Sequence, residues 1–110
     1  MVERYLPHEV PTVYRGGLAV RFNSHEVKID RMTGLLKPSH GISVDSDTDN
    51  VIRFGGAYKV ISIPHGLTII QRGQRETHFE IVPASPMSPA EFQALLDEIE
   101  LEPYTEEYSR

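Results

Sequence analysis

The sequence predicts an α+β fold: a compact, mainly antiparallel β-sheet domain with short helical turns and one amphipathic helix near the C-terminus. Short runs in which apolar and polar residues alternate, separated by turns containing Gly and Pro, are typical of half-buried strands. One later stretch instead repeats its apolar residues at helical spacing. With 110 residues, the chain has room for one such domain.

Alternation identifies the strands, and turn-forming residues separate them. In the last alternating run, His78 and Glu80 emerge on the same face of the predicted strand. The polar segment 45–50 is expected to cap a short helical turn over 51–54, which Gly55 ends. Strands are expected over 12–14, 18–22, 42–44, 58–63, 67–71 and 78–82, and residues 27–30 show the same alternation.

The helix near the C-terminus has the clearest local signals. Ser88 is a candidate N-cap, Pro89 takes the first helical position, and Glu91 completes a capping box. Acidic residues lie off the apolar stripe, which predicts that the helix packs on the sheet with one face. The stripe follows i, i+3, i+4, i+7 spacing and consists of Phe92, Leu95, Leu96 and Ile99.

The chain divides into three predicted segments. Residues 1–11 contain two prolines and little periodicity, so they are expected to form an N-terminal arm. Residues 12–102 form the single α+β domain, and residues 103–110 form an acidic C-terminal tail. We find no apolar signal sequence and no apolar run near the ~20 residues that cross a membrane. We therefore expect a cytoplasmic protein, or one delivered by secretion as part of a longer chain.

Charge and composition exclude several function classes. The net charge is −5, which argues against broad binding to nucleic acid. Every charged residue from Glu91 to Glu107 is acidic, however, so the remainder of the chain is close to neutral and a small anionic ligand such as a dinucleotide is compatible with it. The chain has no Cys, and its five His lack HxH or HExxH spacing, so no metal site is predicted.

Three stretches combine reactive side chains with strand-forming neighbours. Arg15 precedes two glycines, and a guanidinium beside flexible backbone suits phosphate binding. Ser43 lies on the polar face of a strand and is a candidate hydrogen-bonding group. Glu80 interrupts an apolar strand, so it must face solvent, a cation or a cleft, because an unpaired buried carboxylate is costly. His78 shares its face and is a candidate acid–base group.

The order of these stretches resembles the Arg–Ser–Glu class of mono-ADP-ribosyltransferases, as found among bacterial toxins and effectors. Tyr14-Arg15-Gly16 matches the aromatic-Arg-Gly of the family's first strand, and Gly41-Ile42-Ser43-Val44 is similar to its serine motif. The run from Lys59 to Gly66 resembles the strand that ends in a Pro-x-Gly turn. His78-Phe79-Glu80 resembles the Glu/Gln-x-Glu motif, with His78 in the first acidic or amide position.

The resemblance implies NAD as substrate and an acceptor macromolecule as partner. It assigns cofactor binding to Tyr14, Arg15, Gly16 and Ser43, with the guanidinium on the NAD phosphates or the adenosine ribose. It assigns catalysis to Glu80, Ser43 and His78. Glu80 would then bind the ribose 2′-hydroxyl and stabilise the oxocarbenium ion as nicotinamide leaves.

Two other functions remain open. A metal-independent ribonuclease toxin would use His40 and His78 as base and acid, with Arg15 or Arg53 on the phosphate. A non-catalytic interaction or immunity protein would use the acidic helix and tail to meet a basic partner. A transferase of the toxin kind would itself be expected to have a cognate immunity protein as a partner.

Overall fold

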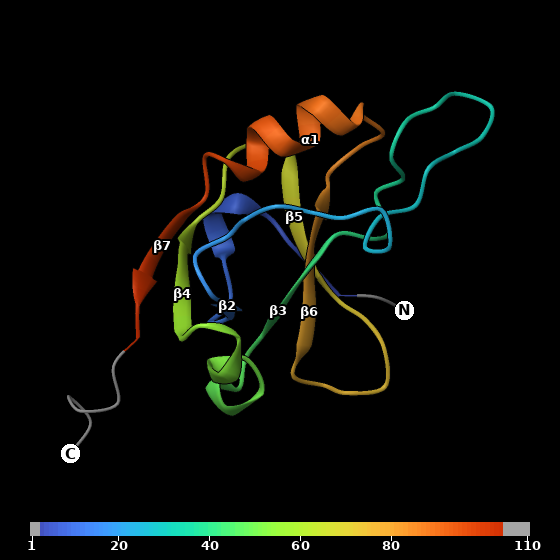
Figure 1. The fold of residues 1–110 in the computed structure, drawn as a ribbon. Helices are drawn as coiled ribbons and strands as arrows, with labels where there is room; N and C mark the ends of the chain where they lie inside the picture. The colour runs from blue at the N-terminus through green and yellow to red at the C-terminus, as the bar shows by residue number, and fades with distance from the viewer. Residues whose placement is uncertain (1–2, 105–110) are drawn as a thin grey trace, which may run out of the picture.

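The computed structural model describes residues 3–104, which form one seven-stranded antiparallel sheet and one α-helix (Figure 1). The predicted α+β class is therefore confirmed. Across the sheet the strands lie in the order β1-β5-β6-β3-β2-β4-β7. The strands are β1 (Arg4–Tyr5), β2 (Tyr14–Gly16), β3 (Ile42–Asp45), β4 (Ala57–Ser62), β5 (Leu67–Gln71), β6 (His78–Pro83) and β7 (Glu100–Pro103). The helices are α1 (Pro89–Leu96) and three 3₁₀ turns, η1 (Pro7–Glu9), η2 (Thr48–Asn50) and η3 (Ile52–Phe54).

Strand β3 holds the two halves of the sheet together. On one side it pairs with β6, where Ser43 is opposite Glu80 and Asp45 is opposite His78. On its other side it meets β2 through the pair Tyr14–Asp45. Residues directly opposite each other in an antiparallel pair project to the same face. The register therefore brings the polar residues of β3 and β6 to one face of the sheet.

The opposite face of β3 and β6 is the core, and α1 covers it. Ile42 and Ile81 are 1% exposed, and Phe92 and Leu96 of α1 are fully buried against the same cluster. Helix α1 begins as predicted: Ser88 is the N-cap, and its Oγ accepts the backbone N–H of Glu91 at 3.1 Å. The helix ends at Leu96, so the predicted stripe residue Ile99 follows the helix and still packs on the core.

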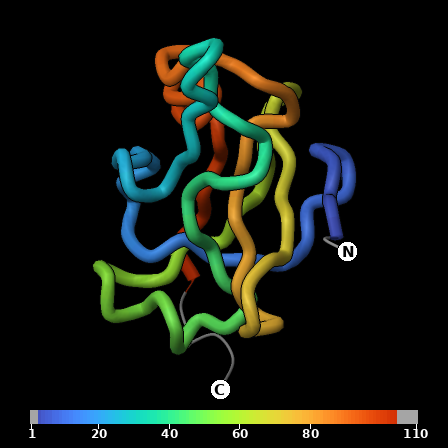
Figure 2. The backbone as a smooth tube through the Cα atoms, turned by 90° about the vertical axis from the view of Figure 1, so that its right-hand side faces the viewer, coloured from blue at the N-terminus to red at the C-terminus, as the bar shows by residue number. Residues whose placement is uncertain are grey.

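Both edge strands include residues outside the predicted domain of 12–102. Arg4 pairs with Ile70 and Tyr5 with Ile69, so part of the expected N-terminal arm is a strand of the sheet. Figure 2 shows this segment, in blue, beside β5 in yellow. Such pairing satisfies the backbone groups of β5, which would otherwise form an open sheet edge. At the other end, β7 runs past the expected boundary at residue 102, and residues 105–110 of the predicted tail lie outside the described residues.

The predicted strand over 18–22 is absent, and residues 27–30 form no strand either. Residues 18–22 have no sheet partner, although Val20 and Phe22 pack on the core and the Phe22 ring lies 5.2 Å from that of Phe92. The apolar residues of this alternating run are therefore packed on the core, but its backbone does not pair with another strand. In the second segment, Ile29 makes only an isolated bridge to Leu36. Within residues 3–104, no helix has the length and apolar character needed to span a membrane.

Candidate functional site

A cavity of about 560 Å³ opens where β2, β3 and β6 meet the turns η2 and η3. Small-molecule sites usually have volumes of about 300–1,000 Å³, so the cavity is large enough for a nucleotide-sized ligand. The loops line it with Asn23, Glu26, Asn50, Val51, Arg53, Phe54 and Arg75. The strands line it with Arg15, Gly16, Ser43, Val44, Asp45 and His78.

Arg15 of β2 is fixed at the cavity wall by two backbone carbonyls. Its Nη1 donates to the carbonyl of Ser43 at 2.8 Å, and its Nε donates to that of Ala19 at 3.2 Å. Burial lowers the pKa of the guanidinium, while the charge of Glu26 acts in the opposite direction. A guanidinium has five N–H donors, and these bonds occupy two of them. Arg15 therefore presents a partly desolvated, oriented cation to the cavity.

The two neighbours of Arg15 have structural contacts that explain their residue types. A Cβ on Gly16 would lie 2.8 Å from the carbonyl oxygen of Val51 and 2.9 Å from Cβ of Phe54. Glycine is thus required here because η3 packs directly on β2. Tyr14, predicted to contact the cofactor, does not line the cavity and stacks edge-on against Tyr104, with 5.3 Å between the ring centroids. Among the predicted cofactor residues, Arg15, Gly16 and Ser43 do reach the cavity.

Glu80 is buried and holds three hydrogen-bond donors. Oε1 accepts the backbone N–H of Gly41 at 3.0 Å, while Oε2 accepts Nε of Arg72 at 2.8 Å and pairs with Nε2 of His78 at 3.1 Å. The side chain is only 7% exposed. Glu80 therefore faces cations and a backbone donor rather than solvent. It does not line the cavity, but its register partner Ser43 and its hydrogen-bond partner His78 both do.

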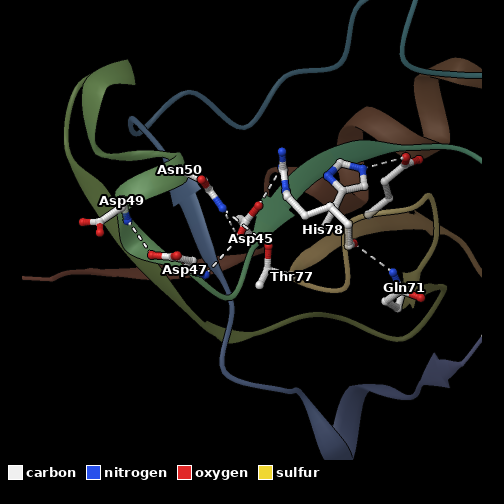
Figure 3. A network of polar contacts seen from close by, with 9 residues as sticks. Asp45, Asp47, Asp49, Asn50, Gln71, Thr77 and His78 are labelled. Atoms are coloured by element: carbon white, nitrogen blue, oxygen red, sulfur yellow. Dashed lines mark hydrogen bonds and ion pairs between the residues drawn. The ribbon is translucent and has the colours of Figure 1, made fainter.

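His78 connects the buried carboxylate to the cavity. Its ring bonds Glu80 through Nε2, the contact drawn as the dashed line from the imidazole in Figure 3. Its side chain is 23% exposed, against 7% for Glu80. A carboxylate that contacts one ring nitrogen sets the orientation of an imidazole. The predicted pair of His78 and Glu80 thus forms a carboxylate–imidazole unit at the cavity.

A second buried carboxylate, Asp45, organises the loops around the cavity (Figure 3). Oδ1 accepts the backbone N–H of Asp47 at 2.8 Å and Nδ2 of Asn50 at 3.1 Å, and Oδ2 pairs with Nη2 of Arg75 at 2.8 Å. Burial pushes the pKa of Asp45 upward, but the hydrogen bonds from Asp47, Asn50, Thr77 and Arg75 outweigh it, and the pKa is lowered. Asp45 is thus held as an anion.

Asp45 was expected in the polar turn segment 45–50, and no local pattern pointed to Arg72 or Arg75 as site residues. The carboxylate partner of Arg75 is 30 residues away in the sequence, and that of Arg72 lies on the next strand, so no local pattern marks either arginine. One signal was present: in a hairpin of 67–71 with 78–82, the residue after the first strand lies beside the start of the second. That register places Arg72 close to His78 and Glu80.

The cavity carries more positive than negative groups. Arg15, Arg53 and Arg75 line it together with His78, whereas its acidic residues are Glu26 and Asp45. Phe54 is 60% exposed at the same site, and the guanidinium carbon of Arg53 lies 5.2 Å from its ring centroid. Cations beside an exposed aromatic ring suit a ligand with both phosphate and base moieties.

His40 lies apart from the cavity-lining residues. Its Nδ1 is 2.8 Å from Oγ of Ser39. Burial lowers its pKa, and the charges of Arg72, Lys28 and Lys37 lower it further, against the opposing charge of Glu80. The two histidines of the predicted ribonuclease site are thus not brought together in this cavity. In the described part of the chain, no group of three His, Asp or Glu residues could hold a metal ion.

Comparisons with protein families, with characterised proteins and with solved structures find no match to this chain.

Proposed function

We propose that the chain is an NAD-dependent mono-ADP-ribosyltransferase acting at the cavity formed by β2, β3 and β6. One observation carries the proposal: Arg15, Ser43 and Glu80 come from three strands that are neighbours in the sheet. Arg15 and Ser43 line the cavity, and Glu80 adjoins it through its contact with His78. The guanidinium of Arg15 bonds the backbone of Ser43, and Ser43 lies opposite Glu80 in the strand register. These three side-chain types occur in the order that the family resemblance requires.

Each residue has a role that its surroundings support. Arg15 and the other cavity arginines bind the pyrophosphate of NAD, since a guanidinium matches phosphate oxygens with paired donors. Ser43 is exposed to the cavity and binds a ribose hydroxyl. Glu80, paired with Arg72, lies behind His78 and acts on the ribose through its charge.

The reaction makes a cation, which explains the need for a fixed carboxylate. The electron pair of the bond between ribose C1 and nicotinamide moves to the pyridine nitrogen, so nicotinamide leaves neutral and positive charge develops on the ribose. A preorganised anion stabilises that charge more than it stabilises the ground state. The acceptor nucleophile then attacks C1 and loses a proton, and His78, an acid–base group that lines the cavity, is the proposed proton acceptor.

Calorimetric titration with NAD tests the proposal on the wild type, Arg15→Ala and Arg15→Lys. Charge-assisted hydrogen bonds contribute about 1.5–3 kcal/mol, so Arg15→Ala should raise the Kd at least about tenfold. Arg15→Lys keeps the charge but not the planar fork and should fall between the two. Arg31→Ala, which removes a cation that does not line the cavity, is the matched control and should bind as the wild type does.

Two outcomes would contradict the proposal. The first is a folded wild type that does not bind NAD, and the second is Arg15→Ala binding NAD with unchanged Kd. Thermal unfolding of each variant is needed alongside, because Arg15 also bonds two backbone carbonyls.

A metal-independent ribonuclease is the second candidate, and the bond between His78 and Glu80 beside three arginines favours it. An imidazole oriented by a carboxylate can move a proton, and the arginines can bind a phosphodiester. Cleavage of RNA without NAD, lost in His78→Ala and retained in Arg31→Ala, would support this function. NAD-dependent transfer that is lost in Glu80→Gln would oppose it.

A further inference from the structure

Arg72 is the cation closest to the buried carboxylate of the proposed active site. It is the first residue after β5, and its Nε lies 2.8 Å from Oε2 of Glu80 on the neighbouring strand β6. Its side chain is 37% exposed, so the guanidinium reaches inward from the edge of the loop over 72–77. Arg72, like Glu80, does not line the cavity, and unlike His78 it makes no link between Glu80 and the cavity.

The three partners of Glu80 fix both oxygens of its carboxylate. Gly41 donates its backbone N–H to Oε1. The backbones of Gly41 and Ile81 lie so close together that a Cβ on Gly41 would be 1.8 Å from the carbonyl oxygen of Ile81. Oε2 lies between the guanidinium of Arg72 and the imidazole of His78. Of these partners, only Arg72 carries a charge that does not depend on pH, because a guanidinium stays protonated in proteins.

Removing Arg72 would leave a buried carboxylate with one backbone donor and an imidazole. A buried charge without its counter-ion is unfavourable, so the carboxylate would turn toward solvent or take up a proton. Either response moves negative charge away from its present position beside Ser43 and His78. The geometry of the site thus depends on a residue that lies outside the cavity.

We propose that Arg72 is a positioning residue for the transferase reaction: it holds Glu80 as an oriented anion opposite Ser43 and in contact with His78. The inference rests on the proposed function and extends it, because Arg72 lies outside the cavity and would have no role if only ligand-binding residues were considered. A positioning residue affects the chemical step and leaves the affinity for NAD almost unchanged.

The test measures nicotinamide release and NAD affinity for Arg72→Met, Arg72→Lys and the control Arg31→Met. A misplaced catalytic group can cost about 100-fold in rate, so we expect Arg72→Met to lower kcat by about that factor. Its Kd for NAD should stay within about twofold of wild type, since Arg72 lies outside the cavity. Arg72→Lys should recover part of kcat because it restores the cation, and Arg31→Met should match the wild type.

A second variant covers the case in which Arg72→Met does not fold. Arg72→Gln keeps a hydrogen-bond donor of similar length without the charge, and it should lower kcat in the same direction. Wild-type kcat in a folded Arg72→Met or Arg72→Gln would overturn the inference and leave the proposed function standing. A raised Kd with unchanged kcat would also overturn it. A wild type that releases no nicotinamide would instead overturn the proposed function, and the inference with it.

Discussion

Two arginines of one loop hold two buried carboxylates, and the two pairs differ in what else they contact. Arg72 pairs with Glu80 and Arg75 pairs with Asp45, each at 2.8 Å. Glu80 is otherwise bonded to the backbone of Gly41 and to the imidazole of His78, a group that can titrate and that lines the cavity. Asp45 is bonded instead to groups of the following loop and turn, which do not titrate.

The role of each ion pair therefore depends on the other groups that its carboxylate contacts. The carboxylate of Asp45 also lines the cavity, but its bonds join β3, η2 and the loop over 72–77, so its main expected effect is on stability. The carboxylate of Glu80 is coupled through His78 to the cavity, so its expected effect is on chemistry. The following predictions test this separation.

The largest expected effect on stability comes from Asp45→Ala. The change leaves the N–H of Asp47 and the amide of Asn50 without their acceptor in a partly buried site, so we expect a loss of about 2 kcal/mol in the free energy of unfolding. Urea unfolding at pH 7 measures it. Asp49→Ala removes an exposed carboxylate from the same turn and should change stability by less than about 0.5 kcal/mol. An Asp45→Ala protein as stable as the wild type would refute the structural role.

The contribution of Asp45 should also disappear in acid. Because its folded-state pKa is lowered, the unfolded chain binds this proton more readily than the folded one. The stabilisation is therefore complete above its ordinary pKa of 3.8 and is lost as the pH falls through the lower, folded-state value. Urea unfolding of wild type and Asp45→Ala at pH 7 and near pH 3 should show a smaller difference at the acid pH. A difference that grows on acidification would contradict the direction of this shift.

A smaller effect is expected from Arg75→Met. The Arg75 side chain is 58% exposed, and solvent-screened ion pairs typically contribute at most about 1 kcal/mol. Most of the stabilisation by Asp45 should therefore persist through its bonds to Asp47 and Asn50. The same urea titration measures this, and a loss above about 2 kcal/mol would show that the pair itself dominates.

Local patterns predicted the central elements well. The strands over 42–44, 67–71 and 78–82 and the capped start of α1 depend on alternation and capping that neighbouring residues determine. The edge strands β1 and β7 were not predicted, because they form by pairing with β5 and β4, which are distant from them in the sequence. For residues 18–22 a strand was predicted that the structure does not have, because the apolar side chains of this run are packed on the core while its backbone has no strand partner.

In the candidate site, too, residues marked by a local pattern were predicted, whereas residues placed by contacts distant in sequence were not. Arg15, Ser43, His78 and Glu80 were found from their residue types and strand context, and the first three line one cavity. Tyr14 was expected at the cofactor and packs on Tyr104 instead, because aromatic contact across the sheet edge is not visible from the motif. The loop arginines were missed, since a loop is positioned only by the hairpin that carries it.

Release of nicotinamide from NAD by the wild type and by Glu80→Gln tests the central claim most directly. Glutamine keeps the size and one acceptor oxygen of Glu80 but removes the charge that would stabilise the ribosyl cation. We predict measurable release by the wild type and a fall of about 100-fold or more in Glu80→Gln, within the range found on removing one preorganised electrostatic group. Equal release by the two folded proteins, or none by the wild type, would contradict the account.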